Sequence, residues 1–369
     1  MPSRGVASSQ LSLLRAFPAL CERLPRRPFI CAPTPVEPFP LDGLPPGALL
    51  VKRDDRSCPL YGGNKPRKLE FLIGAARARG SRRLVTTGGL GTHHGLATAI
   101  LGAEAGLATT LVLLHQPVTK AVGRALLLDA AYGAELVYGA QVTGVALQTA
   151  RVLALSAARG ERPFLVAPGG SSLRGGAGFA SAALELAEQV RAGELPEPAE
   201  LYVAVGTGGT LAGLVVGLRL AGLATRVVGV LVTDILPPSP RSLRRAARAL
   251  LRRLRRADPR VPEVRISHQH FELVREQLGP GYGAATAAGR EAVEAAAACG
   301  LSLETTYTGK CLAEIRERAR RGLLPKGPIL FWNTHNGVDV AARAPRPPAP
   351  EALPPRFRRF VRAAERLAD

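Results

Sequence analysis

One lysine of this chain lies in a glycine-rich turn directly ahead of a helical pattern. It belongs to the run Gly62-Gly63-Asn64-Lys65-Pro66-Arg67-Lys68-Leu69-Glu70. Lysine is the usual Schiff-base residue, because desolvation or nearby cations lower its pKa and leave part of the amine neutral. Arg67 and Lys68 supply positive charge beside Lys65. These residues predict a nucleophilic Lys65, but taken alone they fit a basic first turn of a surface helix equally well.

A second glycine-rich run, Gly206-Thr207-Gly208-Gly209-Thr210, lies between an apolar strand pattern and an apolar helical pattern. A strand, a glycine loop and a helix N-terminus together bind anions, because free N–H groups and the helix dipole point at the ligand. The run is not a dinucleotide fingerprint, since its third glycine would fall at Leu211, and no Gly-Lys-Ser/Thr of a P-loop follows. We therefore expect it to bind a phosphate monoester, and a purely structural turn is the alternative.

A Schiff-base lysine and a phosphate site together indicate pyridoxal 5'-phosphate (PLP) as cofactor. Residues 51–70 resemble the signature of the D-cysteine desulfhydrase and 1-aminocyclopropane-1-carboxylate deaminase family, which belongs to the tryptophan-synthase-β-like PLP enzymes of fold type II. The resemblance extends from about residue 33 to about residue 340. It recurs in further segments, namely Pro168–Ser171, Gly206–Thr210, Gly281–Gly283 and Tyr307–Lys310. Several motifs in the right order carry more weight than any one of them alone.

The resemblance implies roles for the residues of the first two motifs. Lys65 would form the internal aldimine and would then act as the base that removes the α-proton. Asn64 and His93 would contact the cofactor ring. The phosphate group would bind to Gly206, Thr207, Gly208, Gly209 and Thr210.

Two threonines bear on the type of reaction. Thr308 matches a place near the pyridine nitrogen where deaminases of the cyclopropane type carry glutamate, so it resembles the desulfhydrase branch. A neutral partner would leave the ring nitrogen less protonated, and this weaker electron sink suits the elimination of a thiolate. Thr334 matches the threonine of a His-Thr-Gly-Gly segment in similar enzymes, whereas Asn333, His335 and Asn336 depart from that segment.

A third cluster, Thr92-His93-His94, follows the glycine-rich residues 88–91 and opens a helical pattern. A helix N-terminus with a hydroxyl and two imidazoles would suit a substrate carboxylate. In similar enzymes the loop reads roughly Gln-Ser-Asn-His, so Gly91 lacks the amide, and the next three residues replace serine, asparagine and histidine. Metal binding is the alternative. Adjacent helical side chains diverge by about 100° and no third ligand is evident, so we predict no metal site.

Two tyrosines are candidates for proton transfer, Tyr282 between two glycines and Tyr307 just before Thr308. A free phenol with a pKa near 10 is a poor base, and it would need a cationic neighbour. The alternative for each is a packed aromatic ring whose hydroxyl binds the backbone. The predicted catalytic residues are Lys65, Thr92, Tyr282 and Tyr307. The predicted substrate-binding residues are Thr92, His93 and His94.

These residues require a scaffold of alternating strands and helices. Apolar runs of strand length, among them Leu84–Thr86, Leu201–Val205 and Ile329–Trp332, alternate with helical patterns. The alternation predicts an α/β fold with parallel sheets covered on both faces. Proline-rich chain is predicted to about residue 45 and again after residue 343, before a helix at 356–367. The resemblance implies a larger cofactor-binding domain of residues 1–74 and 177–369, and a smaller inserted domain of residues 75–176.

The composition bears on the partners of the protein. The chain has 369 residues, 46% of them hydrophobic, and a formal net charge of +20. Much of this charge lies in Arg241–Arg260, around an apolar stripe of Leu243, Ala247, Leu250, Leu251 and Leu254. Aromatic residues make up only 5% of the chain and none lies in that segment, so a base-stacking surface is missing. A solvated basic helix is therefore favoured over a nucleic-acid contact.

The cysteines and the termini bear on location. The 5 cysteines form no Cys-x-x-Cys pair, which predicts free thiols in a reducing cytoplasm. No apolar stretch reaches the length of about 18 residues that a membrane span needs. The apolar run at Leu11–Leu14 is too short for a secretory signal and ends at Arg15, although a transit peptide stays open. A cytoplasmic homodimer is expected, since enzymes of the family it resembles are commonly dimers.

Together these features predict a PLP-dependent lyase that catalyses α,β-elimination from D-cysteine to give pyruvate, ammonia and sulfide. One enzyme alternative is ring-opening deamination of 1-aminocyclopropane-1-carboxylate, which Thr308 disfavours. Racemisation, or elimination from another D- or β-substituted amino acid, is open as well. An alternative of another class is a basic nucleic-acid-binding protein on a PLP-enzyme scaffold, which would rest on Arg241–Arg260.

Overall fold

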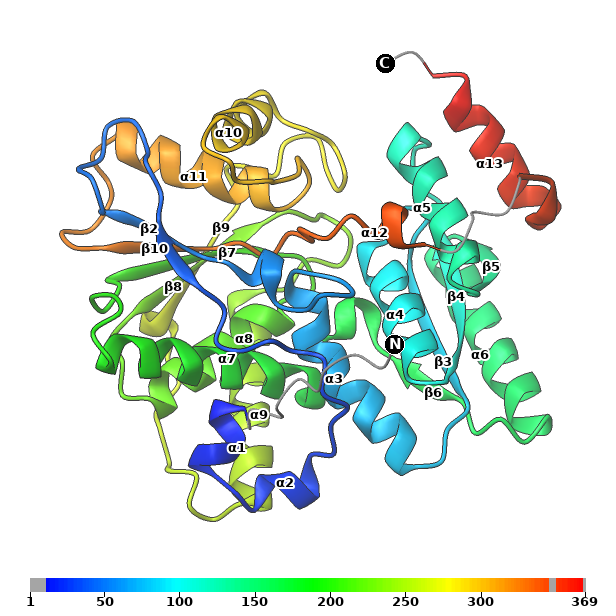
Figure 1. Cartoon of the computed structure of the whole chain (residues 1–369), viewed down its shortest axis with the longest axis horizontal. Coiled ribbons are helices and arrows are strands. Elements are labelled where there is room, and N and C mark those ends of the chain that lie inside the picture. Colours follow the sequence, from blue (N-terminus) through cyan, green and yellow to red (C-terminus); the bar gives the residue numbers. More distant parts are fainter. Residues whose placement is uncertain (1–10, 345–349, 368–369) are drawn as a thin grey trace. The chain divides into compact units, whose positions relative to one another are not determined.

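The computed structural model describes residues 11–344 and 350–367. The chain forms two compact units, whose elements are labelled in Figure 1. The larger unit comprises the residues up to Leu24, Pro28–Glu70 and Ser171–Gly337. The smaller unit comprises Pro25–Arg27, Phe71–Gly170 and the residues from Val338 onward. Residues 1–10, where a transit peptide was left open, and residues 345–349 and 368–369 of the predicted tail lie outside the described residues.

The larger unit is built on a 6-stranded sheet with the strand order β1-β2-β10-β7-β8-β9. Its strands are β1 (Val36–Pro38), β2 (Leu49–Lys52), β7 (Glu200–Val205), β8 (Arg226–Leu231), β9 (Phe271–Val274) and β10 (Ile329–Trp332). All neighbouring pairs are parallel except β1 and β2. Strands β2, β7 and β10 are buried along their whole length, as parallel strands covered on both faces must be.

Helices cover both faces of this sheet (Figure 1). One face carries α10 (Ala287–Ala298) and α11 (Thr308–Arg320), and the other carries α7 (Leu173–Arg191) and α8 (Gly209–Leu220). Helix α3 (Asn64–Ala78) begins in the larger unit and continues into the smaller one. The other helical segments of the larger unit are α1 (Ser12–Ala16), α2 (Leu20–Arg23), α9 (Pro240–Ala257), η1 (Asp54–Arg56) and η3 (His268–His270). The α/β class and the parallel sheets predicted from the sequence are confirmed.

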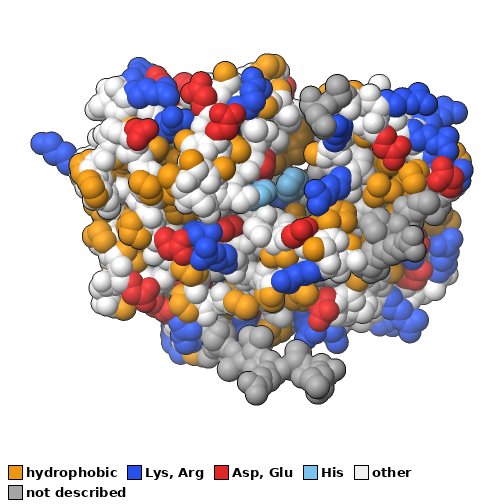
Figure 2. Space-filling model, turned by 45° about the horizontal axis from the view of Figure 1, so that its top comes forward, with side chains coloured by type: hydrophobic (Ala, Val, Ile, Leu, Met, Phe, Trp, Pro, Cys, Tyr) orange, Lys and Arg blue, Asp and Glu red, His pale blue; other side chains and the backbone are white. Residues whose placement is uncertain are grey.

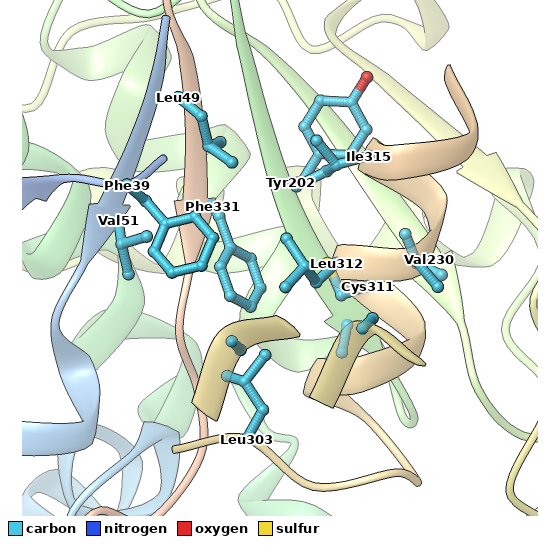
Figure 3. Close-up of a cluster of buried hydrophobic side chains, with 14 of the residues drawn as sticks. Phe39, Leu49, Val51, Tyr202, Val230, Leu303, Cys311, Leu312, Ile315 and Phe331 are labelled. Atoms are coloured by element: carbon cyan, nitrogen blue, oxygen red, sulfur yellow. The ribbon is translucent and has the colours of Figure 1, made fainter. Parts of the chain in front are cut away.

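A cluster of apolar side chains fixes α11 on the sheet (Figure 3). Leu312 and Ile315 of α11 belong to the same buried cluster as Tyr202 of β7 and Phe331 of β10, and all four are fully buried. Burying one such side chain stabilises a fold by about 1.5–3 kcal/mol. The cluster therefore holds the N-terminus of α11 in place, and this is where the predicted site residues Tyr307 and Thr308 lie.

Helices α7 and α8 run side by side in the same direction. A Cβ atom on Gly213 would lie 2.5 Å from the carbonyl oxygen of Gly176, and one on Gly217 would lie 2.3 Å from that of Ala180. Glycine is therefore required at these positions of α8, because any side chain would push the helices apart. Since contacts advance along both helices together, their N-termini lie at the same end, next to the glycine loop at 206–210.

The smaller unit contains a 4-stranded, all-parallel sheet with the strand order β5-β4-β3-β6. Its strands are β3 (Arg83–Gly89), β4 (Ala108–Leu114), β5 (Glu135–Ala140) and β6 (Phe164–Val166). Its helical segments are α4 (His93–Glu104), α5 (Lys120–Ala131), α6 (Val142–Ala158), η2 (Pro168–Gly170), α12 (Val340–Arg343), η4 (Pro350–Ala352) and α13 (Pro355–Glu365). Among the described residues, no helix is both long and apolar enough to span a bilayer.

The C-terminal segment is where the compact units differ most from the predicted domains. Phe357 and Val361 of α13 lie in one buried cluster with Val122 and Leu126 of α5. The residues from Val338 onward therefore group with the smaller unit, whereas the sequence assigned them to the larger domain. The division into domains of residues 1–74 plus 177–369 and of residues 75–176 stays a prediction.

Candidate active site

Lys65 lies in the first turn of α3, and the two glycines before it are needed for steric reasons. Gly63 has a φ of +80°, in the left-handed region that favours glycine, and its Cβ would lie 2.4 Å from the carbonyl oxygen of Thr334. A Cβ on Gly62 would lie 1.9 Å from the carbonyl oxygen of Asp55. The close backbone approach that the glycine-rich turn predicted is therefore present, and it presses this turn against η1 and the end of β10.

Backbone and side-chain hydrogen bonds hold the same turn. Gly63 N–H donates to the Asp54 carbonyl at 2.7 Å, and Asn64 N–H donates to the Thr334 carbonyl at 3.3 Å. Gly62 N–H donates to Oδ1 of Asn336 at 2.6 Å. Asn336 was noted in the sequence as a departure from similar enzymes, and here its amide oxygen serves the lysine turn.

The Lys65 side chain is half-buried, and desolvation lowers the pKa of its amine to about 8, against a smaller opposing effect of Glu304. Its Nζ lies 5.9 Å from the centroid of the Tyr307 ring. A lysine with such a pKa carries a substantial neutral fraction near pH 8, which is what a nucleophilic amine requires. The amine is therefore chemically suited to bond a carbonyl compound.

The sequence offered two causes for a lowered lysine pKa, desolvation and nearby cations, and desolvation is the one that acts here. Arg67 points into a buried ion-pair network, where it binds Asp54 at 2.7 Å and Glu185 at 2.9 Å. Its charge is thus balanced, and burial rather than a neighbouring cation lowers the pKa of Lys65. Lys68 is itself buried, and its pKa is lowered by burial and then by Lys65. The positive charge that Arg67 brings to this turn is taken up by its carboxylate partners, which were not visible in the sequence.

Asp54 is the centre of the network that anchors α3. Its carboxylate accepts hydrogen bonds from Arg67, from the Trp332 indole at 2.7 Å and from the Thr34 hydroxyl at 3.0 Å. Glu185 of α7 joins the network through Arg67 and through Lys52 at 2.8 Å. Because every charge has a partner, the network ties the first turn of α3 to η1, to β10 and to α7.

The glycine loop before α8 forms an open anion cradle. Gly208 has a φ of +83°, and its Cβ would lie 2.3 Å from Cδ2 of Leu243. A Cβ on Gly209 would lie 2.5 Å from the hydroxyl oxygen of Ser171, which itself lies 2.5 Å from the hydroxyl oxygen of Thr207. The N-termini of α7 and α8 meet here, so both helix dipoles favour an anion at this place. The residues present therefore fit a phosphate group.

The lysine turn and the glycine loop touch each other. Nδ2 of Asn64 lies 3.4 Å from the hydroxyl oxygen of Thr210. A Cβ on Gly206 would lie 3.6 Å from the Tyr307 ring. The larger unit thus brings the reactive lysine, the candidate phosphate cradle and an aromatic ring together, as the sequence motifs suggested. Ser171 was part of a recognised motif, but its place beside the glycine loop depends on the packing of α7 against α8.

The two predicted tyrosines form a pair in the larger unit. The hydroxyl groups of Tyr282 and Tyr307 lie 2.7 Å apart, and their ring centroids lie 6.1 Å apart. Burial raises the pKa of both phenols, so both keep their protons at neutral pH. The Lys65 Nζ lies over the Tyr307 ring, 5.9 Å from its centroid. As arranged, the pair can hold or donate a proton but is a poor base.

Thr308 is fully buried, and its hydroxyl is already engaged. It donates to Oε1 of Glu304 at 3.1 Å and accepts from the Glu304 N–H at 3.1 Å. The Glu304 carboxylate also accepts the backbone N–H groups of Thr306, Tyr307 and Thr308. The sequence analysis missed Glu304, although an acidic residue just before a helix is a common partner of its first N–H groups.

The loop after β10 contains the predicted residue Thr334 and its three unusual neighbours. Thr334 contributes its carbonyl group to the lysine turn. Asn333 is fully buried, and its Oδ1 accepts the His335 N–H at 3.1 Å. Burial lowers the pKa of His335, so this imidazole is predominantly neutral at pH 7. The loop therefore shapes the turn that carries Lys65.

Thr92, His93 and His94 lie in the smaller unit, at the N-terminus of α4. Thr92 caps the helix, and its hydroxyl accepts the Gly95 N–H at 3.2 Å. His93 is exposed, whereas His94 is buried with Nε2 3.0 Å from the Thr86 hydroxyl. Since that hydroxyl donates to the Val166 carbonyl at 2.9 Å, it accepts from His94, and this assigns the Nε2–H tautomer. The His94 ring thus ties α4 to the sheet.

An amide side chain covers the turn before α4. A Cβ on Gly89 would lie 2.1 Å from Oε1 of Gln116, and a Cβ on Gly91 would lie 3.3 Å from its Nε2. The sequence indicated that Gly91 lacks the amide of similar enzymes. Within the smaller unit, Gln116 supplies an amide over the same turn from the end of β4, which no local pattern could have predicted.

The basic segment folds as the long helix α9. Its predicted apolar stripe of Leu243, Ala247, Leu250, Leu251 and Leu254 is buried, and its arginines lie largely on the other side. Figure 2 shows one face of the molecule, on which Lys and Arg side chains are interspersed with Asp and Glu side chains. Within the described part of the chain, no group of three or more His, Cys, Asp or Glu side chains could hold a metal ion.

Comparison with known proteins defines the family. A family model described as pyridoxal-phosphate dependent enzyme matches residues 29–335. A D-cysteine desulfhydrase of Salmonella paratyphi A is 33% identical over 335 residues, which cover 88% of this chain and 97% of the relative. A nocardicin C-9' epimerase of Nocardia uniformis is 40% identical over 212 residues, which cover 56% of this chain and 63% of the relative.

A solved structure agrees with these relatives. It is described as an ACC deaminase homologue, and it superimposes with a TM-score of 0.73 at 28% identity, covering 88% of this chain and 94% of that one. Structural neighbours of this kind are PLP enzymes of fold type II, the fold class that the sequence predicted. The family match, the desolvated lysine and the glycine cradle agree, and the chain belongs to the pyridoxal-phosphate-dependent enzymes.

Proposed function

We propose that this protein is a PLP-dependent lyase that catalyses α,β-elimination from D-cysteine, giving pyruvate, ammonia and sulfide. The observation that carries this proposal is the half-buried Lys65, whose amine has a pKa of about 8, in a turn that touches the glycine loop through Asn64 and Thr210. The substrate is taken from the D-cysteine desulfhydrase relatives, which match nearly the whole chain.

The cofactor is assigned to Lys65, to the glycine cradle and to four further residues. Bound PLP supplies an electron sink that stabilises negative charge at the α-carbon of an amino acid. Lys65 would bond to the carbonyl carbon of PLP, and the phosphate group of PLP would bind in the glycine cradle. Further contacts are proposed for Asn64, His93, Thr308 and Thr334. Thr308 would act together with Glu304, because its hydroxyl hydrogen is directed at that carboxylate.

Proton transfer is assigned to the lysine and the tyrosine pair. Lys65 is the proposed base for the α-proton, since a pKa of about 8 lets it accept a proton at working pH. Tyr282 and Tyr307 keep their protons at neutral pH, so we assign them to hydrogen bonding or proton donation at the departing sulfur. Neither tyrosine is proposed as the base.

Binding of the substrate carboxylate is assigned to the N-terminus of α4. Thr92 still has its hydroxyl hydrogen to donate while it accepts the Gly95 N–H, and the exposed His93 can donate from its ring. His94 is proposed to act through its bond to Thr86, by fixing the position of this turn. These roles parallel the serine, asparagine and histidine of similar enzymes.

Epimerisation at an amino-acid α-carbon is a second candidate function. The nocardicin C-9' epimerase relative is 40% identical over 212 residues, a higher identity than that of the desulfhydrases over a shorter stretch. Both reactions begin by removal of the α-proton, and they differ in whether the proton returns or a β-substituent leaves. Deamination of 1-aminocyclopropane-1-carboxylate is disfavoured by Thr308, although the structural neighbour is described as an ACC deaminase homologue.

The experiment that separates these reactions uses one enzyme preparation and several substrates. D-Cysteine, L-cysteine, D-serine and 1-aminocyclopropane-1-carboxylate are incubated with the PLP-loaded protein, and sulfide, ammonia, keto acid and enantiomer composition are measured. We expect sulfide and pyruvate in equal amounts from D-cysteine. Release of no sulfide, together with conversion of one enantiomer into the other, would replace the elimination by the epimerisation.

We also propose that the protein is a cytoplasmic homodimer. The reducing location is supported by Cys31, Cys58, Cys299 and Cys311, which form no disulfide in the structure. Self-association is supported by α6, which exposes Val142, Leu147 and Leu155 and contains only one charged residue, Arg151. In a chain with a net charge of +20, a face of low charge favours contact between copies, because it avoids repulsion between like charges. Nucleic acid is not proposed as a partner.

A further inference from the structure

Glu304 was assigned above only as the hydrogen-bond partner of Thr308, yet its carboxylate lies just before α11 and binds the turn that carries the predicted site residues. It accepts the Thr306 N–H at 2.7 Å, the Tyr307 N–H at 3.0 Å and the Thr308 N–H at 2.8 Å. The Thr308 hydroxyl donates to it as well, at 3.1 Å. One carboxylate thus satisfies the donors of the whole turn that leads into the helix.

This arrangement substitutes for an ordinary helix cap. Tyr307 occupies the cap position of α11, and no side chain caps the helix from there. The Gly309 N–H also bonds back to the Glu304 carbonyl at 2.8 Å, so residue 304 closes the turn through both its side chain and its backbone. The position of the Tyr307 backbone therefore depends on Glu304.

The held turn contacts the reactive amine. The Tyr307 ring lies 5.9 Å from Nζ of Lys65, and its hydroxyl is fixed by Tyr282 at 2.7 Å. Several charged or titratable groups surround this region: Lys68 of α3, Lys310 of α11, His335 after β10 and Glu304. Two further carboxylates lie near these groups, Asp234 beside Lys310 and Asp55 beside His335. Glu304 is the carboxylate that acts on Lys65, where it opposes the loss of the proton that burial favours.

We propose that Glu304 is a positioning residue of the lysine site, which holds Tyr307 against Lys65 and supplies the counter-charge of the Lys65 ammonium group. The proposal rests on the proposed function, because it presumes that Lys65 is the reactive amine. The neutral Thr308 cannot fill this role alone, since it carries no charge and its hydroxyl donates its hydrogen bond to the Glu304 carboxylate.

The test measures the amine directly and does not depend on turnover. Cofactor-free wild type, Glu304→Gln and the control Glu294→Gln are treated with pyridoxal and borohydride between pH 6 and pH 10, and labelling of the Lys65 peptide is quantified. Glu294 lies exposed on α10, so its substitution removes one charge from the same unit without touching the turn.

We expect the labelling midpoint of Glu304→Gln to move down by about one pH unit, the size that an opposite charge typically has on a neighbouring group. The control should superimpose on wild type. A folded Glu304→Gln protein with an unchanged midpoint would overturn the proposal. Failure of wild type itself to label at Lys65 would instead overturn the proposed function, so the two failures are distinguishable.

A second variant covers the case in which Glu304→Gln does not fold. Glu304→Asp keeps the charge but shortens the side chain, so the hydrogen bonds to the turn must lengthen or break. We expect its labelling midpoint to stay close to that of wild type while kcat/KM for D-cysteine falls about 10-fold. An unchanged kcat/KM in this variant would show that Glu304 does not position Tyr307.

Discussion

The side-chain amide of Asn64 lies 3.4 Å from the Thr210 hydroxyl, although 146 positions separate these residues in the chain. Asn64 precedes the reactive lysine, and Thr210 closes the glycine loop. The first turns of α3 and α8 are thereby joined, so a small molecule that bonds to Lys65 also lies within reach of an anion site. This contact is the structural basis for assigning both motifs to one cofactor.

The glycine loop gives a prediction with a matched control. Gly208 and Gly222 have similar positive φ values, +83° and +77°, but a Cβ on Gly208 meets Leu243 whereas one on Gly222 meets nothing within 4 Å. Both Gly→Ala variants should lose about 1–2 kcal/mol through backbone strain. Only Gly208→Ala should also weaken PLP binding, by about 10-fold or more, in a fluorescence titration of the cofactor-free protein. Equal PLP affinities of the two variants would argue against the cradle.

The buried network around Arg67 gives a prediction about stability. Arg67→Met leaves Asp54 and Glu185 buried with fewer partners, which should cost about 3–5 kcal/mol in urea unfolding. Arg56→Met breaks an exposed pair with Glu37 and should cost at most about 1 kcal/mol. Since Arg67 anchors the first turn of α3, its variant should also bind PLP more weakly. Similar losses for the two variants would contradict the anchoring role.

Asp129 gives a prediction about pH. It is fully buried in α5, and neither carboxylate oxygen has a hydrogen-bond partner among the described residues, so burial raises its pKa well above 3.8. A pKa raised on folding contributes stability that is present below the unfolded value, near pH 4, and is lost as pH rises through the folded value. Stability should therefore fall as pH rises from 4.

Asp129→Asn removes this dependence. The variant should have a higher Tm than wild type. The difference in the free energy of unfolding should grow by about 1.4 kcal/mol for each pH unit above 4, until the pKa of Asp129 in the folded state is reached. The exposed control Asp42→Asn should show no such trend. Melting curves at pH 5, 6, 7 and 8 provide the measurement, and a gain that is independent of pH would refute the prediction.

The apolar face of α6 gives a prediction about assembly. Leu147 is 68% exposed, and Leu155 on the same helix is 46% exposed. Leu147→Lys should weaken a homodimer by at least about 10-fold, or 1.4 kcal/mol, because it introduces a charge into an apolar contact. Leu323→Lys, at a 55% exposed position in the larger unit, serves as control. Light scattering behind size exclusion gives the mass, and a dimer unaffected by Leu147→Lys would exclude this face.

Much of the scaffold could be predicted because parallel strands that are buried on both faces appear in the sequence as continuous apolar runs. The apolar runs at 84–86, 201–205 and 329–332 all lie in strands, β3, β7 and β10. The apolar stripe of α9 is buried as predicted. These features depend on local periodicity, which a sequence records directly.

The features that the sequence did not reveal depend on long-range contacts. Glu304 binds the turn at Tyr307, and only the folded chain brings the Tyr307 ring close to Lys65. Gln116 follows a neighbouring strand and lies over the turn before α4. The partners of Arg67 lie 13 and 118 positions away in the sequence. Local sequence patterns therefore predict the helices, the strands and the glycine loops. They do not predict the charge pairs of the site, which form only when distant residues meet in the folded chain.

The most direct test of the account is the bond between Lys65 and the cofactor. Purified wild type and Lys65→Ala are loaded with PLP, scanned between 350 and 500 nm, reduced with borohydride and digested for mass spectrometry, with the exposed Lys326→Ala as control. The account predicts a visible band that reduction abolishes, and a cofactor-derived mass on the peptide that contains Lys65, in wild type and Lys326→Ala but not in Lys65→Ala. A cofactor-derived mass on another lysine, or no band in wild type at saturating PLP, would contradict it.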